Sequence, residues 1–231
     1  PPTTQPPTTQ RPTTRPPKPV PGGSGDLVTE SDFQYQGSFR VPDRTGNDER
    51  STLAWGGAGL GYNEANDSLF ITGHDWHQLT AEISIPELGR SSNVSALPQA
   101  GFLQSLQDVT DGKLPTLSQP KTESYGRIGG YLVDGDDLIV SGYHYYDAAG
   151  EQDRSHLLTD INMGSSSNML SLSDEVDARW LGGAMAVIPD EWRDDFGGDP
   201  FIGGLAGVSI VSNSSVGPAA ATFSKASLQG R

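Results

Sequence analysis

The chain of 231 residues contains no cysteine. Disulfide bonds and thiol chemistry are therefore excluded, although this absence indicates no particular compartment, because many secreted bacterial domains also lack disulfides. A long hydrophobic run is missing as well. No stretch of about 18 apolar residues is present, so no segment is suited to cross a bilayer as a helix.

Basic residues are scarce. The sequence has 15 Lys and Arg against 29 Asp and Glu, a formal net charge of −14. Three of the basic residues, Arg11, Arg15 and Lys18, lie among the first 25 residues, so residues 26–231 hold the other 12 together with all 29 acidic residues. Such a surface repels phosphate backbones and anionic lipid headgroups. We therefore expect neutral or cationic partners, and neither nucleic-acid binding nor membrane insertion.

Residues 1–25 consist almost entirely of Pro, Thr, Gln and basic residues, with a five-residue repeat that starts Pro-Pro-Thr-Thr-Gln. The prolines favour an extended polyproline II backbone, and the closing Gly-Gly-Ser-Gly restores flexibility. We predict a disordered, extended linker or stalk with O-glycosylated threonines. The expected acceptors are Thr3, Thr4, Thr8, Thr9, Thr13 and Thr14. The segment resembles the Pro/Thr linkers of secreted multimodular carbohydrate-active and surface proteins, which implies an extracellular or cell-surface location.

Three stretches of the chain begin with a Gly-Gly step, and an apolar run that contains or ends in glycine follows each of them. The three lead-ins are Trp55–Tyr62, Ile128–Val133 and Leu181–Val187, and the runs that follow are Ser68–His74, Asp137–His144 and Pro200–Leu205. A repeated unit that cannot bury both faces alone stacks on like units, and all-β units of this size commonly stack radially. The sequence therefore predicts an all-β fold over residues 26–231, as a partial or incomplete β-propeller of about three to four blades.

These lead-ins, with the strands Leu69–Gly73 and Leu138–Gly142, resemble those of secreted β-propeller domains. The resemblance assigns no named family, because the Ser-x-Asp-x-Gly-x-Thr-Trp box of sialidase-type propellers and the Trp-Asp signature of WD40 repeats are both absent. Closed propellers have four or more blades. We therefore expect a piece of a longer extracellular protein, truncated at the C-terminus. The alternative is self-association, in which open propeller edges of two copies complete one ring.

Outside the repeats the pattern is weaker. Alternating apolar residues predict a half-buried strand over 33–41, which ends at Pro42. Residues 87–127, rich in Asn, Ser, Pro and Gly, predict a long surface excursion with a short outer strand and one helical turn around 102–106. Further strands are predicted at 208–211 and at 219–223.

Propeller geometry predicts where a site should lie. The innermost strand of a blade starts on the face where the second strand leads into the third. The residues where the lead-ins begin, Trp55, Arg127 and Trp180, should therefore meet the loops 74–78 and 143–156 at the rim of a central channel. We predict that a ligand binds there, on Trp55, Trp76, Asp75, Arg127, Tyr145, Tyr146, Asp147 and Trp180.

All four histidines, His74, His77, His144 and His156, lie in or beside these two loops. Imidazole next to carboxylate can hold a divalent metal, transfer protons or hydrogen-bond sugar hydroxyls, while Trp and Tyr faces can stack on pyranose rings. A purely structural role, in which each imidazole caps a neighbouring carbonyl, explains them equally well. The His-x-x-His spacing on a loop fixes no geometry, so no cofactor, metal site or catalytic residue is assigned.

Three functions follow as hypotheses. The first is an extracellular binding or structural module of a cell-surface or matrix glycoprotein, with a glycan or protein ligand at the rim. The second is a polysaccharide lyase or glycoside hydrolase that uses the rim histidines, with Arg127 holding an acidic sugar. The third is a glycosylated, fibre-forming stalk that carries the propeller as a pendant.

Overall fold

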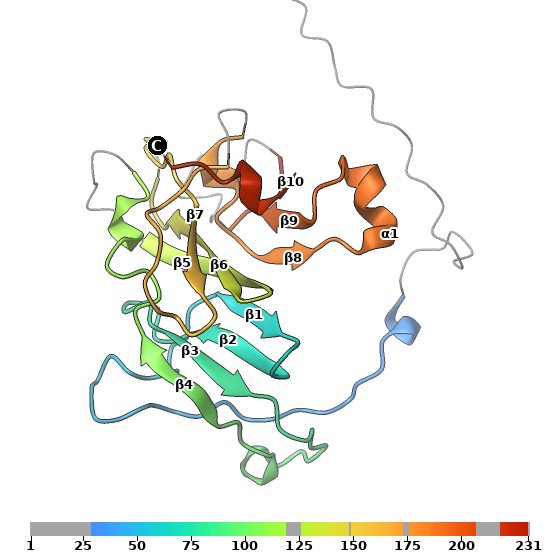
Figure 1. The fold of residues 1–231 in the computed structure, drawn as a ribbon. Coiled ribbons are helices and arrows are strands. Elements are labelled where there is room, and N and C mark those ends of the chain that lie inside the picture. The colour runs from blue at the N-terminus through green and yellow to red at the C-terminus, as the bar shows by residue number, and fades with distance from the viewer. Residues whose placement is uncertain (1–28, 119–125, 148, 173–175, 207–217, 231) are drawn as a thin grey trace, which may run out of the picture. The chain divides into compact units, whose positions relative to one another are not determined.

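A computed structural model describes residues 29–118, 126–147, 149–172, 176–206 and 218–230 (Figure 1). The chain divides into two units, the first ending at Gln36 and the second starting at Gly37. The described part of the first unit, residues 29–36, contains a short 3-10 turn and only exposed residues. Residues 1–28, which include the predicted stalk and its threonines, lie outside the described residues.

The second unit is built from three antiparallel sheets. The first sheet has the order β1-β2-β3-β4, with β1 at Leu60–Asn63, β2 at Ser68–Thr72, β3 at Thr80–Ser84 and β4 at Phe102–Gln107. The middle sheet has the order β5-β6-β7, with β5 at Gly126–Asp134, β6 at Asp137–His144 and β7 at His156–Asp160. The third sheet has the order β10-β9-β8, with β8 at Met185–Val187, β9 at Phe201–Gly204 and β10 at Ala220–Phe223. Within the described residues, the four-residue α1, Asp190–Arg193, is the one α-helix. The all-β prediction is confirmed.

The middle sheet is buried on both faces, which explains its unbroken apolar runs. Successive side chains of a strand point to opposite faces. Tyr131 of β5 therefore packs with Phe70 of β2, whereas its neighbour Leu132 packs with Phe201 of β9. Burying a side chain such as Phe70 contributes roughly 1.5–3 kcal/mol. The two resulting cores join the middle sheet to the sheets on either side of it (Figure 1).

Close backbone approach holds the first and middle sheets together. Gly61 of β1 lies against Tyr131, where a Cβ on Gly61 would come within 2.6 Å of the Tyr131 Cβ. The Tyr131 hydroxyl then extends into the first sheet, where it lies 2.7 Å from the hydroxyls of both Thr72 and Thr80. Burial is the main reason why the pKa of this phenol is raised, so it is neutral and can donate one of these hydrogen bonds.

Glycine makes the contact between the middle and third sheets possible. A Cβ on Gly129 would lie 1.7 Å from the carbonyl oxygen of Gly182, and one on Gly130 would lie 2.9 Å from that of Gly183. The first strands of the three sheets are thus neighbours in space, because β5 contacts both β1 and β8. Within the described residues, the sheets do not close into a ring, so the propeller stays a prediction.

Two local predictions are wrong. The strand expected over 33–41 forms only isolated bridges at Ser38 and Arg40, and the side chains of Phe33 and Tyr35 are 75% and 64% exposed. Among the residues that the structure describes, no continuous strand lies beside it. The helical turn expected around 102–106 is the strand β4, because the edge of β3 pairs with it. The strand expected at 208–211 lies outside the described residues.

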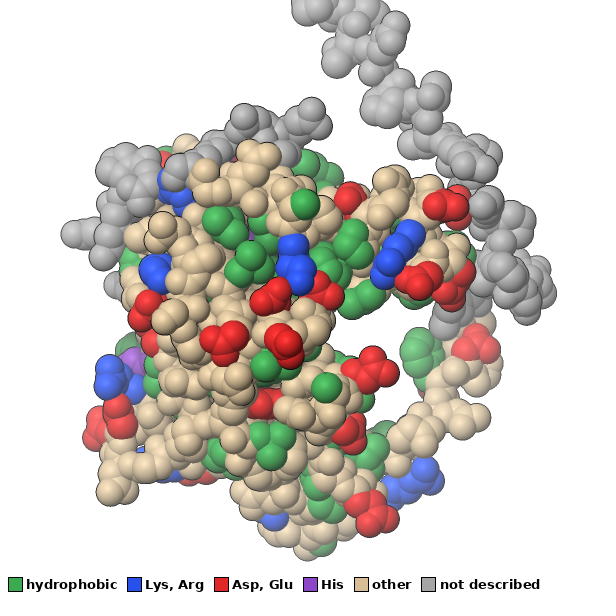
Figure 2. Space-filling model, viewed as in Figure 1, with side chains coloured by type: hydrophobic (Ala, Val, Ile, Leu, Met, Phe, Trp, Pro, Cys, Tyr) green, Lys and Arg blue, Asp and Glu red, His purple; other side chains and the backbone are tan. Residues whose placement is uncertain are grey.

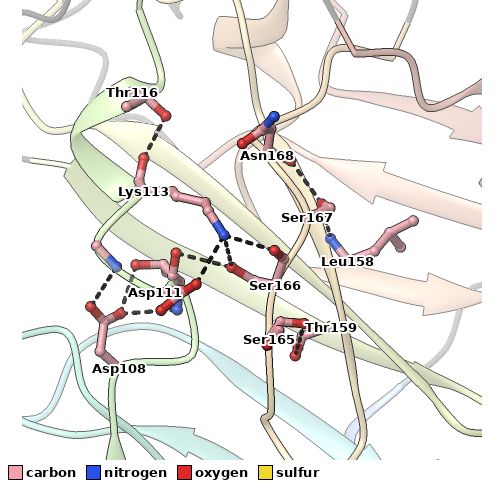
Figure 3. Close-up of polar contacts among 12 residues, drawn as sticks. Asp108, Asp111, Lys113, Thr116, Leu158, Thr159, Ser165, Ser166, Ser167 and Asn168 are labelled. Atoms are coloured by element: carbon pink, nitrogen blue, oxygen red, sulfur yellow. Dashed lines mark hydrogen bonds and ion pairs between the residues drawn. The ribbon is translucent and has the colours of Figure 1, made fainter.

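The segment after β4 is fastened to the loop after β7 (Figure 3). The Lys113 Nζ donates to the carbonyl oxygen of Ser166 at 2.7 Å and pairs with Asp111 at 3.1 Å. In return, the Ser166 hydroxyl donates to the carbonyl oxygen of Thr110 at 3.1 Å. Asp108 closes the turn by accepting from the backbone N–H and the hydroxyl of Thr110. These bonds fix the position of the turn 108–113.

Acidic side chains are spread over the face seen in Figure 2, where they outnumber the basic ones. Acidic side chains also pair with basic ones: Asp134 and Asp137 both pair with Lys225, at 2.6 and 2.8 Å. No helix in the described part of the chain is long and apolar enough to cross a membrane.

Candidate ligand-binding rim

The site begins where the lead-in to the first sheet meets the loop between β2 and β3. Gly56 and His74 form an isolated antiparallel bridge, and the Trp55 carbonyl accepts from the Asp75 N–H at 2.8 Å. Trp55 itself has a φ of 55°. A left-handed backbone is costly for a bulky residue and is found where surrounding contacts enforce it, often at binding sites. The contacts of Asp75 and His74 thus present the indole of Trp55 to solvent.

The loop 74–78 is a closed turn. The carbonyl oxygen of His74 accepts from the N–H groups of His77 and Gln78, at 2.9 and 3.0 Å. The His74 Nδ1 accepts from the N–H of Trp76 at 3.1 Å, so the neutral imidazole carries its proton on Nε2. The two imidazole rings lie 5.0 Å apart, centre to centre. His74 therefore holds the loop together while His77 and Trp76 project from it.

Gln78 anchors this loop to the middle sheet, a role that the sequence did not reveal. Its side-chain oxygen accepts from the N–H of Ile128 at 2.7 Å, and its side-chain nitrogen donates to the carbonyl oxygen of Asp75. Gln78 is buried and has a φ of 53°. No motif marks it, and its position two residues before β3 is the single hint in the sequence.

Arg127, at the start of β5, connects the loop 74–78 to Tyr145. Its Nε donates to Asp75 at 3.0 Å and one of its terminal nitrogens donates to the carbonyl oxygen of Gly126 at 3.2 Å. The guanidinium carbon lies 5.7 Å from the ring centre of Tyr145, within the range of a cation–π contact. Tyr145 in turn meets Tyr146 edge to face at 4.7 Å. The charge of Arg127 is thus committed to Asp75, which disfavours the prediction that it holds an acidic sugar.

Aromatic side chains form much of the exposed surface at this site. The side chains of Trp55, Trp76 and Tyr146 are 83%, 79% and 57% exposed. One hollow of about 490 Å³ is lined by Trp55, Gly56, His74, Asp75 and Trp76. A second, of about 620 Å³, is lined by Asp75, Trp76, His77, Arg127, Tyr145 and Tyr146. Large exposed aromatic residues beside a concave surface are typical of a binding site.

His144 and Asp147 turn inward. His144, the last residue of β6, is 2% exposed, and its Nε2 lies 2.6 Å from the Ser118 hydroxyl. Burial lowers its pKa. Asp147 is 5% exposed and accepts from the backbone N–H groups of Glu151 and Gln152 at 2.7 and 3.3 Å. Both residues fix the loop 143–156 from inside and leave Tyr145 and Tyr146 at its surface.

His156 and Trp180 also lie away from the two hollows. His156 is fully buried in β7, 5.2 Å from the ring of Phe223, and its Nδ1 lies 2.8 Å from the Ser155 hydroxyl. Burial lowers the pKa of His156 to about 4. Trp180 stands in the 3-10 turn Ala178–Trp180, and its buried indole nitrogen has no hydrogen-bond partner among the described residues. The structure therefore groups six of the eight predicted ligand-binding residues and two of the four histidines.

In the part of the chain that the structure describes, no three His, Asp or Glu residues gather closely enough to hold a metal ion. The rim thus offers aromatic faces, one ion pair and two imidazoles, a set suited to hydrogen-bonding and stacking. Comparison with protein-family models, with curated proteins and with solved structures finds no match for the chain.

Proposed function

We propose that the protein is an extracellular binding module whose rim, formed by Trp55, Trp76, Tyr145 and Tyr146, binds a glycan. One observation carries this proposal: two tryptophan side chains, each about four-fifths exposed, line the same hollow, and one of them, Trp76, also lines the second. Exposing two indoles to water is unfavourable unless a ligand covers them. Pyranose rings present apolar C–H faces to such indoles and hydroxyls to neighbouring polar groups.

We also propose that the three sheets are successive blades of a propeller-like domain, an arrangement that would carry such a rim. In support, β1, β5 and β8 follow one another through glycine contacts, and the loop 74–78 and Tyr145 lie at the same ends of their sheets. Loops carried by a rigid scaffold are common sites of binding. The predicted Pro/Thr stalk supports an extracellular or cell-surface location.

Cleavage of a polysaccharide is the second candidate, favoured by a single observation. His74 lines one hollow and His77 the other, with Asp75 between them in the sequence. The side-chain environments favour binding, since the His74 Nδ1 is used within the loop and Asp75 is paired with Arg127.

A binding assay with matched variants tests the proposal. We expect the protein to be retained by at least one of the insoluble polysaccharides cellulose, chitin, xylan and mannan. Trp76→Ala should weaken that binding by about tenfold or more, as loss of a central aromatic anchor does. Phe33→Ala, which truncates an exposed aromatic residue of the other unit, serves as the control and should bind as the unsubstituted protein does.

Unchanged binding by a folded Trp76→Ala variant, checked by near-ultraviolet circular dichroism, would contradict the proposal. Release of soluble sugar from the bound polysaccharide, abolished by His77→Ala, would instead establish the second candidate.

A further inference from the structure

Trp76 stands where three hollows meet. It lines the two already described and a third of about 300 Å³, on which His77, Gln78 and Arg127 also border. The remaining wall of the third hollow includes Asp108, Thr110 and Gly112 of the turn after β4. All three volumes fall within the range of about 300–1,000 Å³ that small-molecule sites have. The concave surface therefore continues past Trp76 in more than one direction.

We infer that this surface binds a neutral oligosaccharide of three or more sugar units, which crosses Trp76 and occupies adjoining hollows. The inference rests on the proposed function and gives it a ligand class. A single sugar would fill one hollow and leave the other exposed aromatic faces uncovered. Trp55 borders the first hollow and Tyr146 the second, so aromatic residues stand on both sides of Trp76.

The charges of the rim select against sugar acids. The side chain of Arg127 is 11% exposed and paired with Asp75, whereas the side chain of Asp75 is 42% exposed. Asp108 adds a second carboxylate at the third hollow. A uronate or sialate entering here would meet two carboxylates and a cation that is already neutralised, within a chain of net charge −14. Hydroxyl groups, in contrast, can donate to these carboxylates.

The surface is held in place before any ligand arrives. The backbone of Trp55 is fixed by Asp75, that of Trp76 by His74, and the whole loop by Gln78. The turn 108–113 is fixed by Lys113 and Ser166 (Figure 3). Prearranged contacts reduce the entropy lost on binding, so each added sugar unit can contribute directly to affinity.

Titration calorimetry with soluble oligosaccharides of one to six units tests the inference. The neutral series come from cellulose, mannan and chitin, and oligogalacturonides of the same lengths form the acidic series. For at least one neutral series we expect the dissociation constant to fall about tenfold or more between one and three units. Oligogalacturonides of equal length should bind at least about tenfold more weakly than that series.

Variants locate the units along the surface. Trp76→Ala should weaken binding at every length of two or more units. Trp55→Ala should weaken the binding of the longer oligomers more than that of the shortest binding oligomer, and Phe33→Ala should weaken neither. Near-ultraviolet circular dichroism confirms that each variant is folded.

Equal affinity for one unit and for six would overturn the inference and leave the proposed glycan binding intact. Preference for oligogalacturonides would also overturn it. Failure of every sugar, soluble or insoluble, to bind the folded protein would overturn the proposed function itself.

Discussion

Glu82 and His156 are both almost completely buried. Their surroundings favour the ionised form of Glu82 but the neutral form of His156. Glu82 accepts hydrogen bonds from Gln104, Ser68, Asn66 and Asn63. Burial raises its pKa, but these four donors together outweigh burial, so its pKa lies below the ordinary value and it is ionised. His156 has one hydroxyl beside its Nδ1, and its Nε2 has no partner among the described residues, so burial keeps it neutral.

This neutral histidine makes stability depend on pH. The pKa of His156 is about 4 in the folded protein against 6.5 for an ordinary histidine, so the unfolded chain binds the extra proton between these two values. The free energy of unfolding should therefore fall as pH decreases from about 6.5 to 4, by about 3 kcal/mol from this residue. Urea unfolding at pH 7, 6, 5 and 4.5 measures it.

His156→Phe removes the titrating group and is the comparison for that experiment. Over the same pH range, the free energy of unfolding of this variant should decrease less than that of the unsubstituted protein. This holds whatever the stability of the variant at pH 7. Parallel pH profiles for the two proteins would contradict a buried, neutral His156.

At the scale of the strand, Gly129 decides whether two sheets can meet. It occupies the register shift in β5, and its Cα faces the carbonyl oxygen of Gly182. Any added carbon would collide with backbone, which cannot move aside as a flexible side chain can. The Gly-Gly steps at Gly129 and Gly182 are therefore requirements of the packing between sheets, whereas Gly56 and Gly57 lie against Thr72 of their own sheet.

Gly129→Ala should destabilise the protein by about 3 kcal/mol, because the middle and third sheets must separate to admit the methyl group. Gly101→Ala is the matched control, since the nearest atom to its added carbon would be the Ser84 hydroxyl at 3.8 Å. Thermal unfolding of both variants measures the difference. Equal midpoints for the two variants would mean that the sheets do not meet at Gly129.

Strand positions were largely predictable because the repeats consist of apolar runs separated by clear turns. A short outer strand is expected within residues 87–127, but the position of β4 was not predicted, because Phe102–Gln107 has no strong strand signal and pairing with β3 decides its conformation.

Propeller geometry predicts that Trp55, Arg127 and Trp180 meet the two loops. Trp55 and Arg127 do contact Asp75, whereas Trp180 lines neither hollow. This geometry could not predict that His144 points inward, because that depends on how the loop 143–156 folds over its own polar groups.

At the scale of the whole molecule, the first unit and the second differ in how much they bury. The side chains of residues 29–36 are all exposed, with Phe33 the most exposed large hydrophobic residue among them. From Gly37 onward the chain makes regular contacts, since Ser38 bridges Gly89 and the Arg40 N–H donates to the carbonyl oxygen of Pro98. The boundary between the units at Gln36 thus coincides with the start of these contacts.

Deletion of residues 1–36 should therefore leave the free energy of unfolding within about 0.5 kcal/mol of the full chain, because none of the described side chains it removes is buried. Deletion of residues 1–44 should cost more, since it also removes the bridges of Ser38 and Arg40 and uncovers part of the core around Ala81 and Ile83. Urea unfolding of the three chains distinguishes these cases. A large loss already at the shorter deletion would place the start of the folded domain before Gly37.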